Sequence, residues 1–340
     1  MPEEGISVTD PASPWMTVTE EECSERVEAI LADSGAAYRE GVYTSDGEGR
    51  LQFLRITRTC SEIAWAMVSQ IRKSRTVSMR FEESFGFSDS VLAPIEVKLE
   101  NGRKAVLVGR IDRIDVIDGG TDDEGNRQEV LRVIDYKTGN AAVNREQIEK
   151  GYKLQLMTYM NAAIPGKSAD ESLGEAADEG DSRMVPAGAF YFKIGSLDID
   201  GDAAGIPESR EEVADRIAGT CRLEGLMVDD ENILKVMDET LEPGVSSRVI
   251  SVRQLKNGSI KPSGACEMMS TEEFRELCSI TARQVERICR EIQEGRIDIA
   301  PKKERKSGPD GEAITACRYC SCKSICLFDT SFRDCRYELV

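Results

Sequence analysis

The 340-residue sequence contains no histidine, so a metal site in this chain must be built from other ligands. It has no apolar run near the roughly 18 residues of a membrane span, and its first residues lack the basic and apolar segments of a signal peptide. The nucleotide-binding pattern Gly-x-x-x-x-Gly-Lys-[Ser/Thr] is also missing, which argues against ATP hydrolysis. These absences predict a cytoplasmic protein with no membrane association.

Basic charge is also scarce, with 44 lysines and arginines against 62 acidic residues and a net charge of −18. Phosphate binding normally requires a basic surface. Salt screens charges over about 8 Å, however, so a local group of basic residues can bind phosphate even on an acidic protein. The charges are unevenly distributed: residues 166–184 carry six acids and two bases, whereas residues 301–340 carry eight bases and six acids. If the chain acts on a nucleic acid, we therefore expect a partner to supply much of the binding channel.

The hydrophobic pattern changes along the chain from helical to strand-like. A capping box at residues 19–22 and an apolar stripe at 51–73 predict N-terminal helices. From residue 79 the period falls to two, and Asn101-Gly102 predicts a hairpin turn. Strands are expected at 79–87, 91–99, 104–117, 131–137 and 187–194, and further helices at 145–163, 209–218, 230–241 and 270–295.

This order of elements predicts an α/β protein with a mixed sheet of four to five strands and helices on both faces. Three parts are expected: a helical segment at 1–78, a core domain at 79–300 and a cysteine-containing segment at 301–340. Within the core, residues 166–184 are poor in aromatic residues and rich in Gly, Ala, Ser and acids, which predicts a flexible insertion.

The candidate functional residues lie close together in the sequence. Asp135 and Lys137 are two apart near the end of a predicted strand, so their side chains leave the same face. A carboxylate beside an ammonium group can hold a hard metal ion and orient a water molecule or a phosphate. The preceding strand contributes Asp112, and Gln155 and Tyr159 share one face of a predicted helix.

Each of these motifs is weak when it stands alone. Asp-x-Lys usually marks a solvated strand end with a surface ion pair, and Gln-x-x-x-Tyr carries almost no information. The ordered combination of all three within about fifty residues favours a functional site.

The three motifs together resemble PD-(D/E)XK nuclease domains of the RecB/AddB kind. The matching residues are Gly109-x-x-Asp112, Asp135-Tyr136-Lys137 and Gln155-x-x-x-Tyr159. The resemblance implies that Asp112, Asp135 and the Tyr136 carbonyl hold Mg²⁺, and that Lys137 orients and helps to deprotonate the attacking water. It also implies that Gln155 and Tyr159 position the DNA backbone.

The C-terminal cysteines extend this resemblance. Cys317, Cys320 and Cys326 have the C-x2-C-x5-C spacing that, in AddB-type chains, ligates a 4Fe–4S cluster, which implies a C-terminal iron–sulfur extension. Cys322 falls at a position that need not ligate. A small zinc site made by these four cysteines is the alternative, but the second C-x2-C pair usual in zinc ribbons is missing. Because eleven cysteines occur without an export signal, we expect thiols or metal ligands and no disulfides.

The sequence also departs from the family pattern. Family members carry a metal-binding histidine in a Gly-x-x-x-His helix and a first cluster cysteine further upstream, and neither motif is found here. The chain is therefore expected to correspond to the C-terminal part of such a protein, to lack the fourth cluster ligand and to be a weak nuclease alone. Cys23 and Cys60 precede the core, but both occupy positions where a helix needs an apolar residue.

The function implied is that of a Mg²⁺-dependent DNA exonuclease in a helicase–nuclease complex with an AddA-like partner subunit. Such a complex acts in double-strand-break repair by homologous recombination. Two alternatives remain open: a CRISPR-associated iron–sulfur nuclease, and a non-catalytic module that binds DNA ends or serves as a scaffold.

Overall fold

The computed structural model describes residues 8, 10–37, 43, 46–121, 125–139, 141–164, 183–194, 210–307, 311–333 and 335–340. The predicted α/β architecture is confirmed, with a mixed sheet of six strands in the order β1-β4-β5-β6-β7-β10. The bounds are Thr76–Phe85 (β1), Gly109–Thr121 (β4), Arg127–Lys137 (β5), Arg183–Lys193 (β6), Glu224–Val228 (β7) and Glu267–Met269 (β10). The prediction of four to five strands is wrong because the short β7 and β10 extend the sheet beyond β6.

Neighbouring strands of this sheet pair in both directions. The pairs β1–β4, β4–β5 and β6–β7 are antiparallel, whereas β5–β6 and β7–β10 are parallel. Three smaller sheets surround it. They consist of β2 (Ile95–Lys98) with β3 (Lys104–Leu107), β8 (Val252–Gln254) with β9 (Ile260–Pro262), and β11 (Lys302–Ser307) with β12 (Ala313–Thr315) and β13 (Glu338–Leu339). The predicted hairpin turn at Asn101-Gly102 is confirmed, since it joins β2 to β3 through a short 3-10 turn at Glu100–Gly102.

The helices begin where the sequence offers caps. At the start of α2 (Glu20–Ala37), Thr19 Oγ1 accepts the Glu22 N–H at 3.2 Å while Glu22 accepts the Thr19 N–H at 2.9 Å. Ser270 and Glu273 form the same reciprocal pair at the start of α8 (Thr271–Gln293). Both predicted capping boxes are thus confirmed. The other helices are α1 (Pro14–Thr17), α3 (Gly47–Ile71), α4 (Arg145–Glu149), α5 (Gln155–Ala163), α6 (Arg210–Thr220), α7 (Glu231–Met237) and α9 (Lys323–Cys326).

Two predicted elements are divided in the structure. The helix expected at 145–163 is wrong as one element, because Gly151 and Lys153 adopt positive φ values of 71° and 54° that interrupt it between α4 and α5. The strand expected at 104–117 consists of β3 and β4, which belong to different sheets. The insertion expected at 166–184 lies outside the described residues, except for Arg183 and Met184 at the start of β6.

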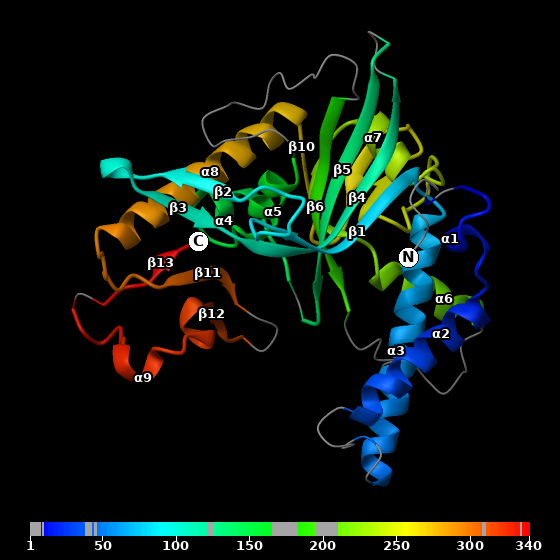
Figure 1. Ribbon diagram of the computed structural model, residues 1–340, viewed down its shortest axis with the longest axis horizontal. Coiled ribbons are helices and arrows are strands. Elements are labelled where there is room, and N and C mark those ends of the chain that lie inside the picture. Colours follow the sequence, from blue (N-terminus) through cyan, green and yellow to red (C-terminus); the bar gives the residue numbers. More distant parts are fainter. Residues whose placement is uncertain are drawn as a thin grey trace.

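The helices divide between the two faces of the large sheet. Helices α4, α5 and α8 pack together, and α5 lies against β5 and β6 (Figure 1). On the opposite face, α7 lies against β4, and the long helix α3 buries Ile63, Ala66, Val68 and Ile71. Figure 1 also shows the C-terminal segment with β11, β12 and α9 on the other side of the molecule from α2 and α3. None of the helices in the described segments is long and apolar enough to span a bilayer.

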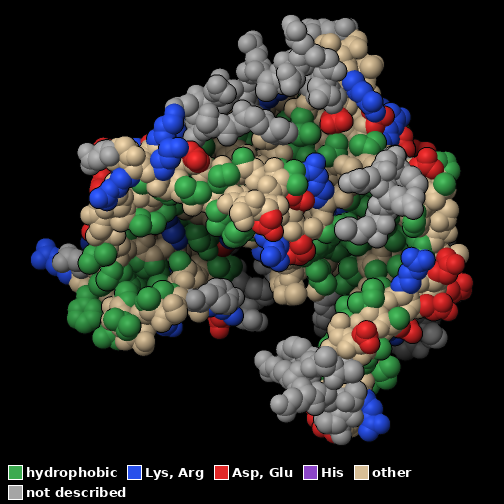
Figure 2. Space-filling view, in the orientation of Figure 1, with side chains coloured by type: hydrophobic (Ala, Val, Ile, Leu, Met, Phe, Trp, Pro, Cys, Tyr) green, Lys and Arg blue, Asp and Glu red, His purple; other side chains and the backbone are tan. Residues whose placement is uncertain are grey.

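The visible surface carries charges of both signs. On the face shown in Figure 2, the lysine and arginine side chains among the described residues are scattered between acidic ones and form no continuous basic surface. This distribution agrees with the net charge of −18. On this face, a basic contact with an anionic ligand would be local.

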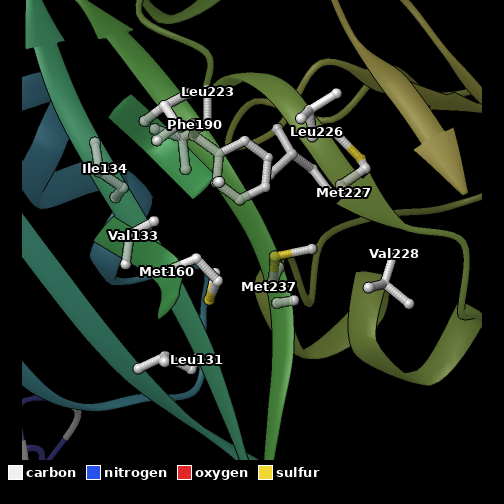
Figure 3. Packing of buried hydrophobic residues seen from close by; sticks show 14 of the residues in the cluster. Leu131, Val133, Ile134, Met160, Phe190, Leu223, Leu226, Met227, Val228 and Met237 are labelled. Carbon is white, nitrogen blue, oxygen red and sulfur yellow. The ribbon is translucent and has the colours of Figure 1, made fainter. Parts of the chain in front are cut away.

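The hydrophobic core is built around the central strands β5 and β6. Because helices cover both of their faces, these strands read as almost continuous apolar runs. Phe190 of β6 is fully buried and lies among side chains from β5, β7, α5 and α7 (Figure 3). The other labelled members of this core cluster are Leu131, Val133, Ile134, Met160, Leu223, Leu226, Met227, Val228 and Met237. This packing fixes the ends of β5 and β6 as a rigid platform.

A buried ionic cluster lies on the α3 face of the sheet. Asp115 accepts two hydrogen bonds from Arg113 and one from Arg132, each at 2.7 Å, and all three side chains are at most 1% exposed. Burial opposes the charge of Asp115, but the two guanidinium groups hold its pKa below the usual range. The apolar periodicity of the chain contains no sign of this cluster.

Candidate active site and cysteine-lined pocket

Asp135 and Lys137 meet at the carboxyl end of β5, on the face covered by α5. The Lys137 Nζ lies 2.5 Å from Asp135 Oδ2, so the two side chains share one face as strand alternation predicts. The Asp135 side chain is only 2% exposed, whereas that of Lys137 is 32% exposed. The pair is therefore not the solvated surface ion pair that the alternative interpretation of Asp-x-Lys required.

Asp112 of β4 is tied to the same strand end. Its Oδ2 accepts the backbone N–H of Tyr136 at 2.8 Å. Since β4 and β5 are antiparallel neighbours with Arg113 opposite Ile134, Asp112 projects from the same face as Asp135. The two carboxylates are close enough for the charge of Asp112 to affect the titration of Asp135.

Gln155 connects the members of the site. Its side-chain amide group donates to Asp135 Oδ1 and to the Tyr159 hydroxyl oxygen, at 3.0 Å in each case. Its amide oxygen accepts from Lys137 Nζ at 3.2 Å. The start of α5 thus holds Asp135 and Lys137 in one orientation, and Tyr159 packs edge-on against Phe85 of β1 with ring centroids 6.3 Å apart.

The electrostatics of Asp135 reflect its burial. Desolvation raises the pKa of this carboxyl, the neighbouring Lys137 ammonium opposes the rise, and the charge of Asp112 adds to it. Desolvation also raises the pKa of Tyr191, whose ring lies 5.6 Å from Lys137 Nζ. A perturbed carboxyl next to a cation in a partly open site is typical of a functional centre.

The donor set fits a hard divalent cation that keeps part of its hydration. Asp135 Oδ2 is buried and accepts no regular hydrogen bond, although Lys137 lies beside it, and Asp112 adds a second carboxylate. Among the described residues, no three or more His, Cys, Asp or Glu side chains form a ready metal-binding group. Mg²⁺ does not require one, since it commonly uses one or two carboxylates together with water and substrate phosphates. The Tyr136 carbonyl as a further ligand stays a prediction.

Three residues beside this centre were not predicted from the sequence. Tyr191 and Lys193 of β6 lie directly opposite Asp135 and Lys137 of β5, and Glu224 of β7 lies opposite Tyr191. The only signal was a lysine that closes the apolar run of β6. Without the pairing register, that lysine could not be distinguished from an ordinary solvated strand end.

The cysteine-containing segment forms a separate pocket of about 260 Å³. Cys317, Cys320 and Cys326 all line it, whereas Cys322 is exposed and does not. The other lining residues are Glu312, Ala313, Thr315, Arg318, Lys323, Phe328 and Tyr337. Three thiols around one pocket agree with the predicted ligand set, but in the described part of the chain they are not gathered into a ready metal-binding group. Cluster binding therefore stays a prediction.

Two other cysteines lie away from this pocket. Cys60 is in the middle of α3, on the opposite side of the molecule from α9, and Cys23 is buried in α2 (Figure 1). Burial raises the pKa of both thiols, which disfavours the thiolate that a metal requires. Both observations agree with the prediction that neither cysteine supplies a fourth ligand.

Comparison with known proteins gives consistent matches over nearly the whole chain. The family model of the PD-(D/E)XK nuclease superfamily matches residues 12–327. Similar curated proteins include one from Alkaliphilus oremlandii (28% identical over 326 residues), one from Thermoanaerobacter sp. strain X514 (29% over 328) and one from Clostridium perfringens strain SM101 (30% over 330). Each is named as a subunit of an ATP-dependent helicase/deoxyribonuclease. The matches cover 96% of this chain but 26% of each relative, so the chain spans about a quarter of their length.

Proposed function

The chain belongs to the PD-(D/E)XK nuclease superfamily, and we propose that it hydrolyses phosphodiester bonds of DNA at the site formed by Asp112, Asp135 and Lys137. The observation that carries this proposal is the contact of the Lys137 ammonium with a nearly buried Asp135 carboxylate, beside Asp112. Burying an ionised pair is costly unless it is well hydrogen-bonded. A strand end that keeps two carboxylates and a lysine in this arrangement is therefore well suited to chemistry on a charged substrate.

Each residue has a role that follows from its position. Asp112 and Asp135 would hold Mg²⁺, which supplies Lewis acidity toward the phosphate and lowers the pKa of water. Lys137 Nζ, held between Asp135 and Gln155, orients the attacking water, and its ammonium charge favours the loss of the water proton to solvent. Gln155 keeps Asp135 and Lys137 in place, and the Tyr159 hydroxyl beside it lies where it can contact the DNA backbone.

We propose that this nuclease acts within a helicase–nuclease complex that processes DNA ends for recombinational repair, as an exonuclease with an AddA-like helicase partner. The names of the relatives support this, and so does the net charge of −18, which is unfavourable for DNA binding without a partner. The three pocket-lining cysteines are proposed to provide three of the four thiolates of a 4Fe–4S cluster. A CRISPR-associated nuclease has the same chemistry, but no relative described above carries such a name.

The test compares variants of the complex assembled with its helicase partner. Asp135→Asn and Lys137→Ala are each expected to abolish Mg²⁺-dependent DNA degradation while leaving unwinding nearly unchanged. Asp298→Asn and Lys235→Ala are matched controls, since both residues form exposed ion pairs, with Arg296 and Glu231. If either site variant degrades DNA at the parental rate, the catalytic assignment is wrong. If the parental protein binds DNA ends but does not degrade DNA when Mg²⁺ is added, the scaffold alternative is favoured.

A further inference from the structure

Lys193 lies next to Lys137 in the central sheet. The strands β5 and β6 are parallel, and Lys137 is the register partner of Lys193. Adjacent strands are about 4.8 Å apart and register partners project from the same face, so the two lysines leave the sheet side by side. Both stand at the carboxyl ends of parallel strands, which is where α/β proteins commonly bind their ligands.

Each lysine has its own carboxylate. Lys193 Nζ lies 2.5 Å from Glu224 Oε2, while Lys137 Nζ lies 2.5 Å from Asp135 Oδ2. Tyr191 stands between the two carboxylates, because it is the register partner of Asp135 on β5 and of Glu224 on β7. Three adjacent strands thus place a row of two carboxylates next to a row of two ammonium groups.

The Lys193–Glu224 pair is better explained by ligand binding than by stability. The side chains of Lys193 and Glu224 are 25% and 17% exposed, so both are largely desolvated. Replacing such a pair by apolar residues is often neutral or stabilising, and two neighbouring lysines also repel each other. An ammonium group has three N–H donors, so Lys193 can donate to Glu224 and still donate to an anion bound at the carboxyl end of β6.

We propose that Lys193 is a second phosphate-binding residue of the nuclease site, which binds the DNA backbone phosphate next to the scissile one, and that Glu224 is its positioning residue. This inference rests on the function proposed above. The Glu224 carboxylate is largely buried, and its Oε1 also accepts a long hydrogen bond from the Ala265 N–H at 3.4 Å. Lys193 is thereby held beside Lys137 as a local basic contact on an acidic protein.

The test measures binding of the chain, assembled with its helicase partner and without ATP, to a fluorescent single-stranded oligonucleotide over a range of salt concentrations, with Ca²⁺ in place of Mg²⁺ to prevent cleavage. Lys193→Met is expected to weaken binding roughly tenfold, the loss typical of one charge-assisted hydrogen bond. It should also reduce the slope of log K against log salt by about 0.7, the value for one phosphate contact on a single strand. Lys193→Arg should retain the parental slope, because it retains the charge.

Two further variants separate binding from folding. Lys193→Met leaves Glu224 without its cation, so the double variant Lys193→Met/Glu224→Gln, which buries no unpaired charge, should show the same reduced slope. Lys235→Met removes a lysine that is ion-paired with Glu231 at 2.6 Å on α7, and should change neither affinity nor slope. Glu224→Gln alone should keep the slope while lowering the cleavage rate in Mg²⁺.

The possible results distinguish this inference from the function on which it rests. If the folded double variant Lys193→Met/Glu224→Gln keeps the parental affinity and salt slope, the role of Lys193 is wrong. The nuclease assignment would still stand in that case, provided that Lys137→Ala abolishes cleavage. If the parental chain, assembled with its helicase partner, neither binds nor cleaves the oligonucleotide, the nuclease proposal fails and the role of Lys193 fails with it.

Discussion

Gln155 offers the sharpest test of how the site is held together, because one side chain makes three of its hydrogen bonds. It donates to Asp135 and to Tyr159 at 3.0 Å and accepts from Lys137 at 3.2 Å. Gln155→Ala removes all three contacts without removing either charged residue. We expect the variant to fold normally, since Gln155 is exposed at the start of α5, and to lose activity.

The expected loss follows from the bonds removed. A hydrogen bond to a charged group contributes about 1.5–3 kcal/mol, and two of the three involve Asp135 or Lys137. We assume that only the loss of the bond to Asp135 affects the rate. Because each 1.36 kcal/mol changes the rate tenfold, the cleavage rate should decrease by roughly 10- to 150-fold. Within the protein, Tyr159→Phe removes the neutral bond to Gln155. The loss of this bond alone corresponds to about 0.5–1.5 kcal/mol, or a decrease of roughly 2- to 13-fold.

The assay is single-turnover cleavage of a single-stranded oligonucleotide over a range of Mg²⁺ concentrations, with the enzyme in excess. Because Gln155 orients Asp135, the Mg²⁺ concentration for half-maximal rate should rise in Gln155→Ala, in line with the effect of removing partners of metal ligands. Urea unfolding of each variant checks that the fold is intact. Equal losses in Tyr159→Phe and Gln155→Ala would contradict the expectation that Gln155 acts mainly through Asp135.

The double variant Gln155→Ala/Tyr159→Phe completes the test. If Tyr159 contributes only through its bond to Gln155, the double variant is as slow as Gln155→Ala alone, because the bond is already lost. If Tyr159 also contacts the DNA backbone, as proposed, the double variant is slower still. Full activity of Gln155→Ala at all Mg²⁺ concentrations would refute the view that this residue organises the site.

Two other predictions concern the remainder of the molecule. Asp115→Asn leaves Arg113 and Arg132 buried without their carboxylate, so it should lower the free energy of unfolding by about 3–5 kcal/mol in urea titrations. The control is Glu239→Gln, in the exposed ion pair with Arg75, which should change the free energy of unfolding by at most about 1 kcal/mol. After anaerobic reconstitution with iron and sulfide, the purified chain should bind less than a full 4Fe–4S complement because three cysteines line the pocket. Cys317→Ser should lower the iron content further, and Cys60→Ser should leave it unchanged. If the parental chain binds four irons and Cys60→Ser loses them, Cys60 is the fourth ligand and the prediction is wrong.

Local sequence signals predicted much of the fold and the relation between Asp135 and Lys137. Strand alternation places two residues of spacing two on one face, and the structure has them 2.5 Å apart. The two capping boxes and the Asn101-Gly102 turn are likewise set by interactions within a few residues. Such features depend on chain geometry alone, so they can be derived before any tertiary contact is known.

Features that depend on tertiary contacts could not be predicted in this way. The break between α4 and α5 requires Lys153 at positive φ. Its side chain contacts residues that are remote in the sequence, since its Nζ donates a hydrogen bond to the Ala142 carbonyl and forms an ion pair with Glu304. Glu224 became recognisable as a neighbour of the site only through the register that pairs β5 with β6 and β6 with β7. Neither relation leaves a periodic signal in the sequence.

Tyr136 shows why the site depends on both faces of the sheet. Its backbone N–H binds Asp112, while its side chain projects to the opposite face, where the hydroxyl donates to Met67 Sδ of α3 at 3.4 Å and the ring packs edge-on against Phe192. The positive charge of Arg113 acts on the same tyrosine and opposes the rise of its pKa caused by burial. The buried Arg113–Asp115–Arg132 cluster and α3 therefore fix the segment of β5 from which Asp135 and Lys137 project. A change on the α3 face that displaces Tyr136 should therefore also disturb Asp112 and the end of β5.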